Sequence, residues 1–284
     1  MAEARPRRES QINTSAGHVF DTLRAVASAA APIGGTEVAR AVGVPVSTAH
    51  RALVTLEETG FISRSEGGPK FRLGLGAFEL VAALTARYAI RDAAQDCLRT
   101  LAAATGETCS LVIRLGWYAV CIDGHEGWQA VHRPLRIGER APLHRTAAGR
   151  VLLAGHDAET VRAYARSAQA GSLSSVEVRK LRSELAEAAE LGHAVEENAA
   201  ADGAGGVATI AFAVRGPDGV AVAAIAVSGP AGQFRPAEDE RRAEWAELVR
   251  PLEAEVAAGP ARFADPFGHL PPDTIVLSQV GGTA

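Results

Sequence analysis

Residues 35–73, GTEVARAVGVPVSTAHRALVTLEETGFISRSEGGPKFRL, restrict the fold of this chain more than any other stretch. Their order predicts a short helix, a tight turn, a longer amphipathic helix and a charged two-stranded hairpin. Gly43 ends the first helix because glycine enters the left-handed region without penalty, and Pro45 sets the backbone angle at which the second helix starts. A helix-turn-helix with a hairpin wing has this order, and it places its second helix in the major groove of DNA. The run therefore predicts that the chain binds double-stranded DNA.

The two helices of this run each have a predicted inner face. Val38, Ala41 and Val42 form the inner face of the first helix, which Thr36 is expected to cap. In the second helix the spacing of apolar residues predicts a buried stripe of Val46, Ala49, Leu53 and Leu56. Taken singly, a polar residue at a helix start is more often a cap, and an exposed arginine is more often a solvated charge. Taken together, we expect the following residues to contact DNA: Thr36, Ser47, Thr48, His50, Arg51, Arg64, Lys70 and Arg72.

The charge of the chain is unevenly distributed. Residues 1–75 hold nine Arg or Lys against seven Asp or Glu, a balance of +2, whereas the remainder holds 20 against 26, a balance of −6, and the two sum to the net charge of −4. Binding to phosphates depends on the few cations that reach them rather than on the total. Arg5, Arg7 and Arg8 are expected to form a flexible basic arm, and the small positive margin favours two modules that grip two half-sites together.

Composition excludes several classes of protein. No uninterrupted apolar run is long enough to cross a bilayer, and the polar N-terminus MAEARPRRES lacks the apolar core of a secretory signal, so we expect a cytoplasmic protein. Cys97, Cys109 and Cys121 lie in apolar segments without a CxxC pair. They are interpreted as small buried hydrophobic residues in a reducing compartment, with a disulfide or a metal site among them as the alternative.

The periodicity outside the opening run predicts an α+β chain. A helix over residues 15–30, with Phe20, Leu23, Ala27 and Ala30 on one face, completes the first core. A helix from Leu75 to Tyr88 follows the wing and either links two domains, with its apolar side packed on a second copy, or is a core helix of the second domain. Beyond it we expect helices over residues 92–104, 146–153, 176–191 and 236–257, and strands over residues 108–115, 118–123, 207–214 and 220–228. Gly216-Pro217-Asp218-Gly219 predicts a hairpin between the last two strands.

These elements divide the chain into five segments. They are a basic arm (residues 1–14), the winged helix-turn-helix domain (15–75), a linker or dimerisation helix (76–90), an antiparallel sheet flanked by helices (91–258) and a loose C-terminal tail (259–284).

Several motifs in the same order resemble the IclR family of bacterial transcriptional regulators. They are the run from residue 35 to Arg64, FRLG, LAAATGETCSLVIRLG, RIGERAPLHRTAAGRVLLAG, ELGHAVEEN and VAAIAVSGP, and the resemblance covers about residues 15–257. It implies a homodimer, or a dimer of dimers, whose C-terminal GAF-like domain binds a small effector.

The same resemblance implies where the effector lies. The segment His144 to Gly149 offers backbone N–H groups at a helix start that suit a carboxylate. The family lines its pocket with small residues here, with an acidic residue later in the chain, and with positions on the final strands. The implied effector-binding residues are Ala147, Ala148, Gly149, Glu196 or Glu197, Thr209, Ala226 and Ser228.

The chain departs from the family in this region. An extra AAADGAG-like stretch precedes Gly206, and Thr209, Ala213 and Ala226 replace the usual Cys, Pro and Ser, which implies a different, more apolar ligand. Trp117, Trp128 and His132 are expected to form an aromatic roof or else to pack ordinarily. Arg133 and Arg136 either pair with an acidic effector or are solvated.

Enzyme motifs are missing from the sequence. It has no GxSxG elbow, Walker loop or HExxH helix, and the adjacent Glu196 and Glu197 point to opposite faces of a strand. We therefore expect a ligand-responsive regulator, most simply a repressor of a catabolic operon, with no cofactor and no metal. The alternatives are a metabolite sensor whose N-terminal module contacts protein, and an enzyme with an unrecognised site in the second domain.

Overall fold

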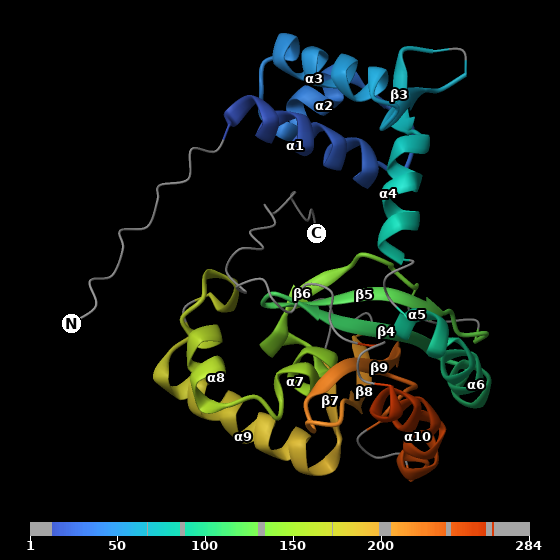
Figure 1. The fold of residues 1–284 in the computed structure, drawn as a ribbon, viewed down its shortest axis with the longest axis vertical. Helices are drawn as coiled ribbons and strands as arrows, with labels where there is room; N and C mark the ends of the chain where they lie inside the picture. The colour runs from blue at the N-terminus through green and yellow to red at the C-terminus, as the bar shows by residue number, and fades with distance from the viewer. Residues whose placement is uncertain are drawn as a thin grey trace. The chain divides into compact units, whose positions relative to one another are not determined.

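The computed structural model describes residues 13–66, 68–85, 89–129, 134–171, 173–198, 206–236, 240–259 and 263, and it separates into two compact units (Figure 1). The division falls after Ala86. Arg5, Arg7, Arg8, Tyr88, His132 and Arg133 lie outside the described residues, as does most of the segment predicted to be a tail.

The first unit is a winged helix-turn-helix. It contains α1 (Thr14–Ser28), α2 (Gly35–Val42) and α3 (Val46–Glu58), followed by α4 (Leu75–Thr85). A small sheet of β1 (Ile33–Gly34), β2 (Ile62–Arg64) and β3 (Lys70–Leu73) has the order β1-β3-β2, and the β2–β3 hairpin is the predicted wing.

Local signals explain where these helices begin and end. Asn13 caps α1 by accepting hydrogen bonds from the backbone N–H groups of Ser15 and Ala16. Gly43 ends α2 with a φ of 75°, as predicted. The prediction that Thr36 caps α2 was wrong, because the helix already starts at Gly35 and the side chain of Glu37 accepts the N–H of Gly34 at 2.8 Å.

The core of the first unit confirms three positions of the predicted stripe on α3. Ala49, Leu53 and Leu56 are buried against Val38 of α2, together with residues of α1, β2 and β3. Val46 was assigned to the same stripe, but its side chain is 54% exposed. As the first residue of α3, it has no preceding helical turn to cover it.

Two other inner faces were predicted incorrectly. On α1, Phe20 and Ala27 are exposed, and the buried residues are Thr22, Ala25 and Val26; Ala30 is also exposed and lies beyond the end of the helix at Ser28. Alanine occupies so many positions near the end of this helix that the apolar pattern does not define one face. On α2, Ala39 is buried whereas Ala41 is exposed.

The second unit is built on a six-stranded antiparallel sheet. Its strands are β4 (Thr108–Leu115), β5 (Tyr118–His125), β6 (Arg140–Pro142), β7 (His193–Asn198), β8 (Val207–Arg215) and β9 (Ala221–Pro230), in the order β6-β5-β4-β9-β8-β7. The hairpin at residues 216–219 joins β8 to β9, as predicted, with Gly219 at a φ of 79°. The predicted α+β class is confirmed.

Helices cover both faces of this sheet. On one face lie α5 (Ala89–Ala93), α6 (Gln95–Thr105) and α10 (Arg242–Ala258), and on the other lie α7 (Ala147–Leu153), α8 (Ala158–Ala165) and α9 (Ser175–Leu191) (Figure 1). The sequence did not predict α8 or the short strand β6. It also started the last helix at Pro236, whereas α10 starts at Arg242.

The two faces of the sheet differ in side-chain size. Along β8, Ile210, Phe212 and Val214 pack towards α6 and α10, whereas the alternate positions facing α7 include Ala211 and Ala213. The strand period of two separates these sets. Small residues on the second face leave space between the sheet and the segments that cover it, and that space contains the candidate ligand site.

Candidate functional site

The N-terminal half of α3 exposes a polar surface. Ser47, His50 and Arg51 are exposed and Thr48 is half-buried. Thr36 is exposed on the preceding helix. In a helix-turn-helix, side chains at this end of the second helix reach base edges. The structure thus leaves the predicted base-facing residues accessible, and their contact with DNA stays a prediction.

The wing carries three predicted cations in two different environments. Lys70 and Arg72 are exposed on β3. Arg64 is also exposed, but it is paired with a carboxylate of the protein: its Nε donates to Glu57 Oε1 at 2.9 Å and its Nη2 donates to Glu57 Oε2 at 3.2 Å. Its guanidinium also lies 4.9 Å from the ring centroid of Phe71. Arg64 is therefore better suited to positioning the wing against α3 than to reaching a phosphate.

Val46 is an exposed residue that the sequence interpretation assigned to the core. It is the first residue of α3 and lies one turn before His50, on the same side of the helix. An apolar side chain at this position can contact the methyl group of thymine in the major groove. Its place directly after Pro45, at the helix start, was the signal that could have identified it.

The second unit contains a cavity of about 710 Å³ between the sheet and the segment from residue 134 to α7. This volume lies within the range of sites for small organic molecules. Strands β4, β5, β7, β8 and β9 supply its floor. The lining residues are Thr108, Ser110, Val112, Ala119, Cys121, Pro134, Leu135, Arg136, Glu139, Arg140, Ala141, Pro142, Arg145, Thr146, Ala148, Glu196, Gly206, Val207, Thr209, Ala226 and Ser228.

Half of the residues predicted to bind the effector line this cavity. The residues in its wall are Ala148, Glu196, Thr209, Ala226 and Ser228, and those outside it are Ala147, Gly149, Glu197, Trp117 and Trp128. The two glutamates differ because neighbouring residues of β7 point to opposite faces, so Glu197 is exposed while Glu196 is half-buried. Strand alternation on β4 could have added Thr108 and Ser110, since Cys109, Leu111 and Ile113 are the apolar residues of the other face and pack in the core there.

The start of α7 is occupied by the protein's own groups. The N–H of Ala147 donates to Glu196 Oε2 at 2.8 Å, and the N–H of Gly149 donates to Thr146 Oγ1 at 3.0 Å. The expectation of free N–H groups at these two positions was therefore wrong. Gly149 has a packing role instead, because a Cβ atom there would lie 2.2 Å from the carbonyl oxygen of Leu143.

The two tryptophans do not roof the cavity. Trp117 is buried, and its ring centroid lies 5.5 Å from that of Tyr164, so ordinary packing explains it. Trp128 is 74% exposed, next to Gly106 in the turn between α6 and β4. Of the two alternatives, an aromatic roof or ordinary packing, Trp117 follows the second, and the segment that covers the cavity, residues 134–142, contains no tryptophan.

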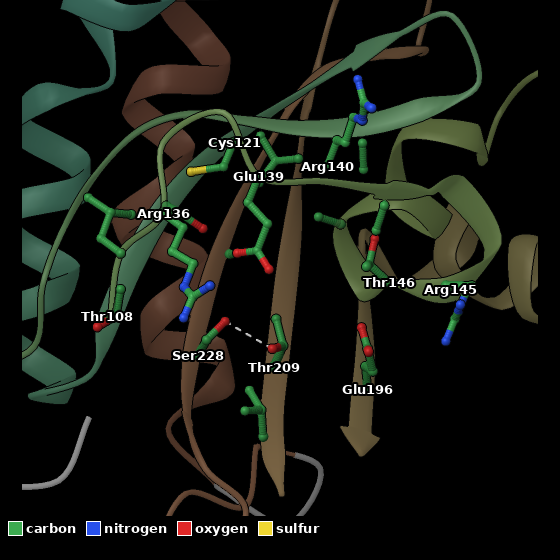
Figure 2. Close-up of a pocket in the computed structure, with 18 of the residues that line it drawn as sticks. Thr108, Cys121, Arg136, Glu139, Arg140, Arg145, Thr146, Glu196, Thr209 and Ser228 are labelled. Atoms are coloured by element: carbon green, nitrogen blue, oxygen red, sulfur yellow. Dashed lines mark hydrogen bonds between the residues drawn. The ribbon is translucent and has the colours of Figure 1, made fainter. Parts of the chain in front are cut away.

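Polar side chains form a row across four neighbouring strands at the cavity floor. Thr108 of β4 pairs with Ser228 of β9, Ser228 pairs with Thr209 of β8, and Thr209 pairs with Glu196 of β7. The hydroxyl groups of Thr209 and Ser228 are hydrogen-bonded at 2.9 Å and both residues are buried (Figure 2). The row gives the cavity hydrogen-bonding groups on an otherwise alanine-rich surface.

A histidine and a tyrosine support the wall behind the cavity. The hydroxyl of Tyr164 lies 2.6 Å from His144 Nδ1 and accepts the backbone N–H of His144 at 2.9 Å. Burial, together with the nearby charge of Arg145, lowers the pKa of His144, and burial raises the pKa of Tyr164 to about 12. The Nδ1 of neutral His144 can accept a hydrogen bond from the Tyr164 hydroxyl, which fixes the segment just before α7.

Two of the three cysteines are buried, and the third is partly exposed. Burial raises the pKa of both Cys97 and Cys109 to about 12, which keeps them as thiols, and none of the three is in a disulfide. Cys121 lies in the cavity wall. Within the described part of the chain, no group of three or more His, Cys, Asp or Glu side chains is placed to hold a metal ion.

Among the described residues, no helix is long and apolar enough to cross a membrane.

Comparison with known families accounts for both units. The model of the IclR helix-turn-helix domain matches residues 15–66, and that of the bacterial transcriptional regulator IclR C-terminal domain matches residues 82–256. The chain belongs to the IclR family.

Individual relatives of this IclR-family chain are distant. KipR of Bacillus subtilis (strain 168) is 30% identical over 163 residues, which make up 56% of this chain and 65% of KipR. XynR of Escherichia coli (strain K12) is 36% identical over 119 residues, 42% of this chain and 47% of XynR. The chain thus spans less than two thirds of the length of these curated relatives, both of which are named as transcriptional regulators.

Solved IclR structures match more of the chain. The IclR of Thermotoga maritima has a TM-score of 0.65 at 25% identity, over 86% of this chain and 98% of that one. An IclR homologue of Microbacterium hydrocarbonoxydans, solved in complex with 4-hydroxybenzoate, has a TM-score of 0.66 at 20% identity over the same shares. These neighbours confirm the fold.

Proposed function

We propose that this protein is a ligand-responsive transcriptional regulator. The observation that carries the proposal is the pairing, in one IclR-family chain, of a winged helix-turn-helix with a separate unit that contains an open cavity of about 710 Å³. The first feature supplies a DNA-contacting surface, and the second supplies a place for a small effector.

The DNA-contacting surface consists of the exposed side of α3 and the wing. Ser47, His50 and Arg51 face base edges, with Val46 against a thymine methyl group. Lys70 and Arg72 neutralise phosphates beside the groove. Arg64 acts indirectly, by fixing the wing to Glu57 of α3 at 2.9 Å.

A second copy of the chain completes the DNA-binding form. On α4, Leu75, Phe78 and Val81 recur every three residues, and each is more than half exposed. Apolar side chains in such a stripe are usually covered by a partner. A dimer also doubles the small positive margin of the N-terminal module, so that two modules hold two half-sites. A dimer of dimers extends the same arrangement.

The effector is a small organic acid or aromatic compound. The cavity combines arginines with an alanine-rich floor, which suits a molecule with a charged end and an apolar body. The 4-hydroxybenzoate bound by the homologue of Microbacterium hydrocarbonoxydans belongs to this class.

Effector binding changes the populations of two arrangements of the paired DNA-binding modules. A ligand that binds one arrangement of the paired modules more tightly than another changes the fit to an operator in the bacterial cytoplasm. Repression of a catabolic operon is the simplest outcome, and repressors such as AllR of Escherichia coli are among the relatives.

A band-shift assay on DNA upstream of the protein's own gene tests DNA binding. Arg51→Ala should weaken operator binding by about tenfold, the loss expected for one arginine–base contact. Arg99→Ala, an exposed arginine of the second unit, is the matched control and should bind as the wild type does. Wild-type protein that shifts no upstream fragment, or Arg51→Ala that binds as tightly as the control, would contradict the proposal.

Size-exclusion chromatography with light scattering tests the dimer. Phe78→Asp should yield a monomer with weaker operator binding, whereas Glu79→Gln on the same helix should stay dimeric. A monomeric wild-type protein, or a dimeric Phe78→Asp variant, would remove α4 as the interface.

A further inference from the structure

The cavity is lined by more cationic than anionic side chains. Three arginines (Arg136, Arg140 and Arg145) and two glutamates (Glu139 and Glu196) line it, so the arginines exceed the glutamates by one. The row of paired residues on the floor gives the cavity two ends, because Thr108 on β4 and Glu196 on β7 are separated by the strands β9 and β8.

The Thr108 end has the groups that bind a carboxylate. Figure 2 shows the guanidinium of Arg136 reaching into the cavity from the covering segment, on the side where Thr108 and Ser228 lie. Within the described residues, the structure gives the Arg136 guanidinium no ion pair and no hydrogen bond. An arginine fork binds a carboxylate with two parallel hydrogen bonds, and hydroxyl groups beside it supply further donors.

The opposite end already holds a carboxylate of the protein. Glu196 Oε2 accepts the N–H of Ala147 at 2.8 Å, so the position in which an acid would meet the start of α7 is filled. A second negative charge at this end would be repelled in a partly buried site, where charges interact more strongly than in water. Arg145 lies in the wall here; like Arg136 it is exposed, so solvent weakens the attraction of either arginine for a carboxylate, and the negative charge of Glu196 is what distinguishes this end.

An apolar part of the cavity wall adjoins this polar row. Ala226 of β9, Ala119 of β5 and Ala148 of α7 line it, and none of these side chains extends beyond one methyl group. Such a surface accommodates a flat ring or a short alkyl chain.

We propose that this cavity selects a monocarboxylic acid with an apolar body, whose carboxylate binds Arg136 beside Thr108 and Ser228. Glu196 excludes a second carboxylate at the other end and so discriminates against the diacid of the same length. The proposal rests on the cavity being the effector site of the proposed regulator, and it assigns specificity to Arg136 and Glu196.

The test compares matched ligands on the full-length protein. The probes are benzoate, 4-hydroxybenzoate and hexanoate, the primary amide of each acid, and the diacids terephthalate and adipate. Thermal-shift screening identifies the acids that bind, and calorimetry then measures each Kd for wild type, Arg136→Gln, Glu139→Gln and Glu196→Gln. Arg162→Gln on α8 is the control, because this exposed arginine does not line the cavity.

We expect at least one monoacid to bind about tenfold more tightly than its amide, the size of one charge-assisted contact at an exposed arginine. Arg136→Gln should abolish this preference, and Arg162→Gln should keep it. Glu139→Gln should tighten acid binding, because it removes a negative charge from the same segment. Glu196→Gln should reduce the difference in Kd between the diacid and the monoacid. The amide oxygen of the new glutamine can still accept the N–H of Ala147.

Three results would overturn the inference. They are equal binding of acid and amide, an acid preference that survives in Arg136→Gln, and the absence of binding by every probe. The band shift of the ligand-free protein is measured in parallel for all variants. If the wild type binds the operator but one of these three ligand results is found, only the proposed ligand selectivity is contradicted. If the wild type does not bind the operator, the proposed function is contradicted.

Discussion

Gly149→Ala should destabilise the second unit and deform the cavity. The added Cβ would lie 2.2 Å from the carbonyl oxygen of Leu143 and 2.7 Å from its carbonyl carbon and Cα. A relaxed carbon–oxygen contact needs about 3.3 Å, so backbone atoms must separate by roughly 1 Å. Strain of this kind costs about 3 kcal/mol, the upper part of the range for overpacking, and the better helix propensity of alanine returns about 1 kcal/mol. We therefore expect a net loss of about 2 kcal/mol.

Tryptophan fluorescence is suited to this measurement because Trp117, Trp128 and Trp245 all lie in the second unit. For a unit of this size, a loss of about 2 kcal/mol lowers Tm by roughly 4–8 °C. Gly17→Ala is the control of opposite sign, since a Cβ there meets nothing within 4 Å, inside α1. It should leave the fluorescence transition unchanged and slow amide exchange in α1. A Gly149→Ala variant as stable as wild type, with unchanged binding of the effector, would refute the packing role of Gly149.

Three further predictions concern other parts of the chain. Leu53→Ala should cost the first unit about 2–5 kcal/mol, because Leu53 is fully buried, and should abolish band shifts while ligand binding measured by calorimetry persists. Val46→Ala should weaken binding to a selected operator about fourfold, equivalent to about 0.8 kcal/mol for a buried methyl group, and the loss should vanish when deoxyuridine replaces the contacted thymidine. Burial lowers the pKa of His144 in the folded protein, so the unfolded chain binds the proton more readily. The contribution of His144 to the free energy of unfolding is therefore complete above about pH 6.5, the pKa of an unperturbed histidine, and decreases as the pH falls below it. His144→Gln should therefore flatten the pH dependence of urea unfolding between pH 7 and 5, and an unchanged slope would contradict this.

The fold was largely predictable because its strongest signals are local. Gly43 and Pro45 mark the turn of the helix-turn-helix, and the 216–219 sequence marks a hairpin, whatever the rest of the chain does. Burial on α1 was not predictable in the same way. Phe20 is 62% exposed, although it is the largest apolar residue of that helix, because burial depends on how the helix is rotated against α2 and α3.

The residues of the candidate site were predictable only where strand alternation or a family motif indicates which side chains face the cavity. Thr209 and Ser228 were found through the resemblance, and β-strand alternation explains why they share a face. The roles at α7 depend on a contact between residues 147 and 196, which are far apart in sequence. Nothing in the local pattern shows that Glu196 reaches Ala147, or that Arg64 is held by Glu57.

The contact of Arg64 with Glu57 has a consequence for engineering operator specificity. Transplanting a recognition helix from another protein is a common way to change the DNA sequence that a regulator reads. A graft that replaces residues 46–56 leaves Glu57 in place and preserves the attachment of the hairpin. A graft that continues to the end of α3 removes the acceptor and leaves the guanidinium against the Phe71 ring without its carboxylate partner, so we expect the hairpin to be held less firmly against α3. In this protein, the hairpin and the final turn of α3 should be exchanged as one cassette.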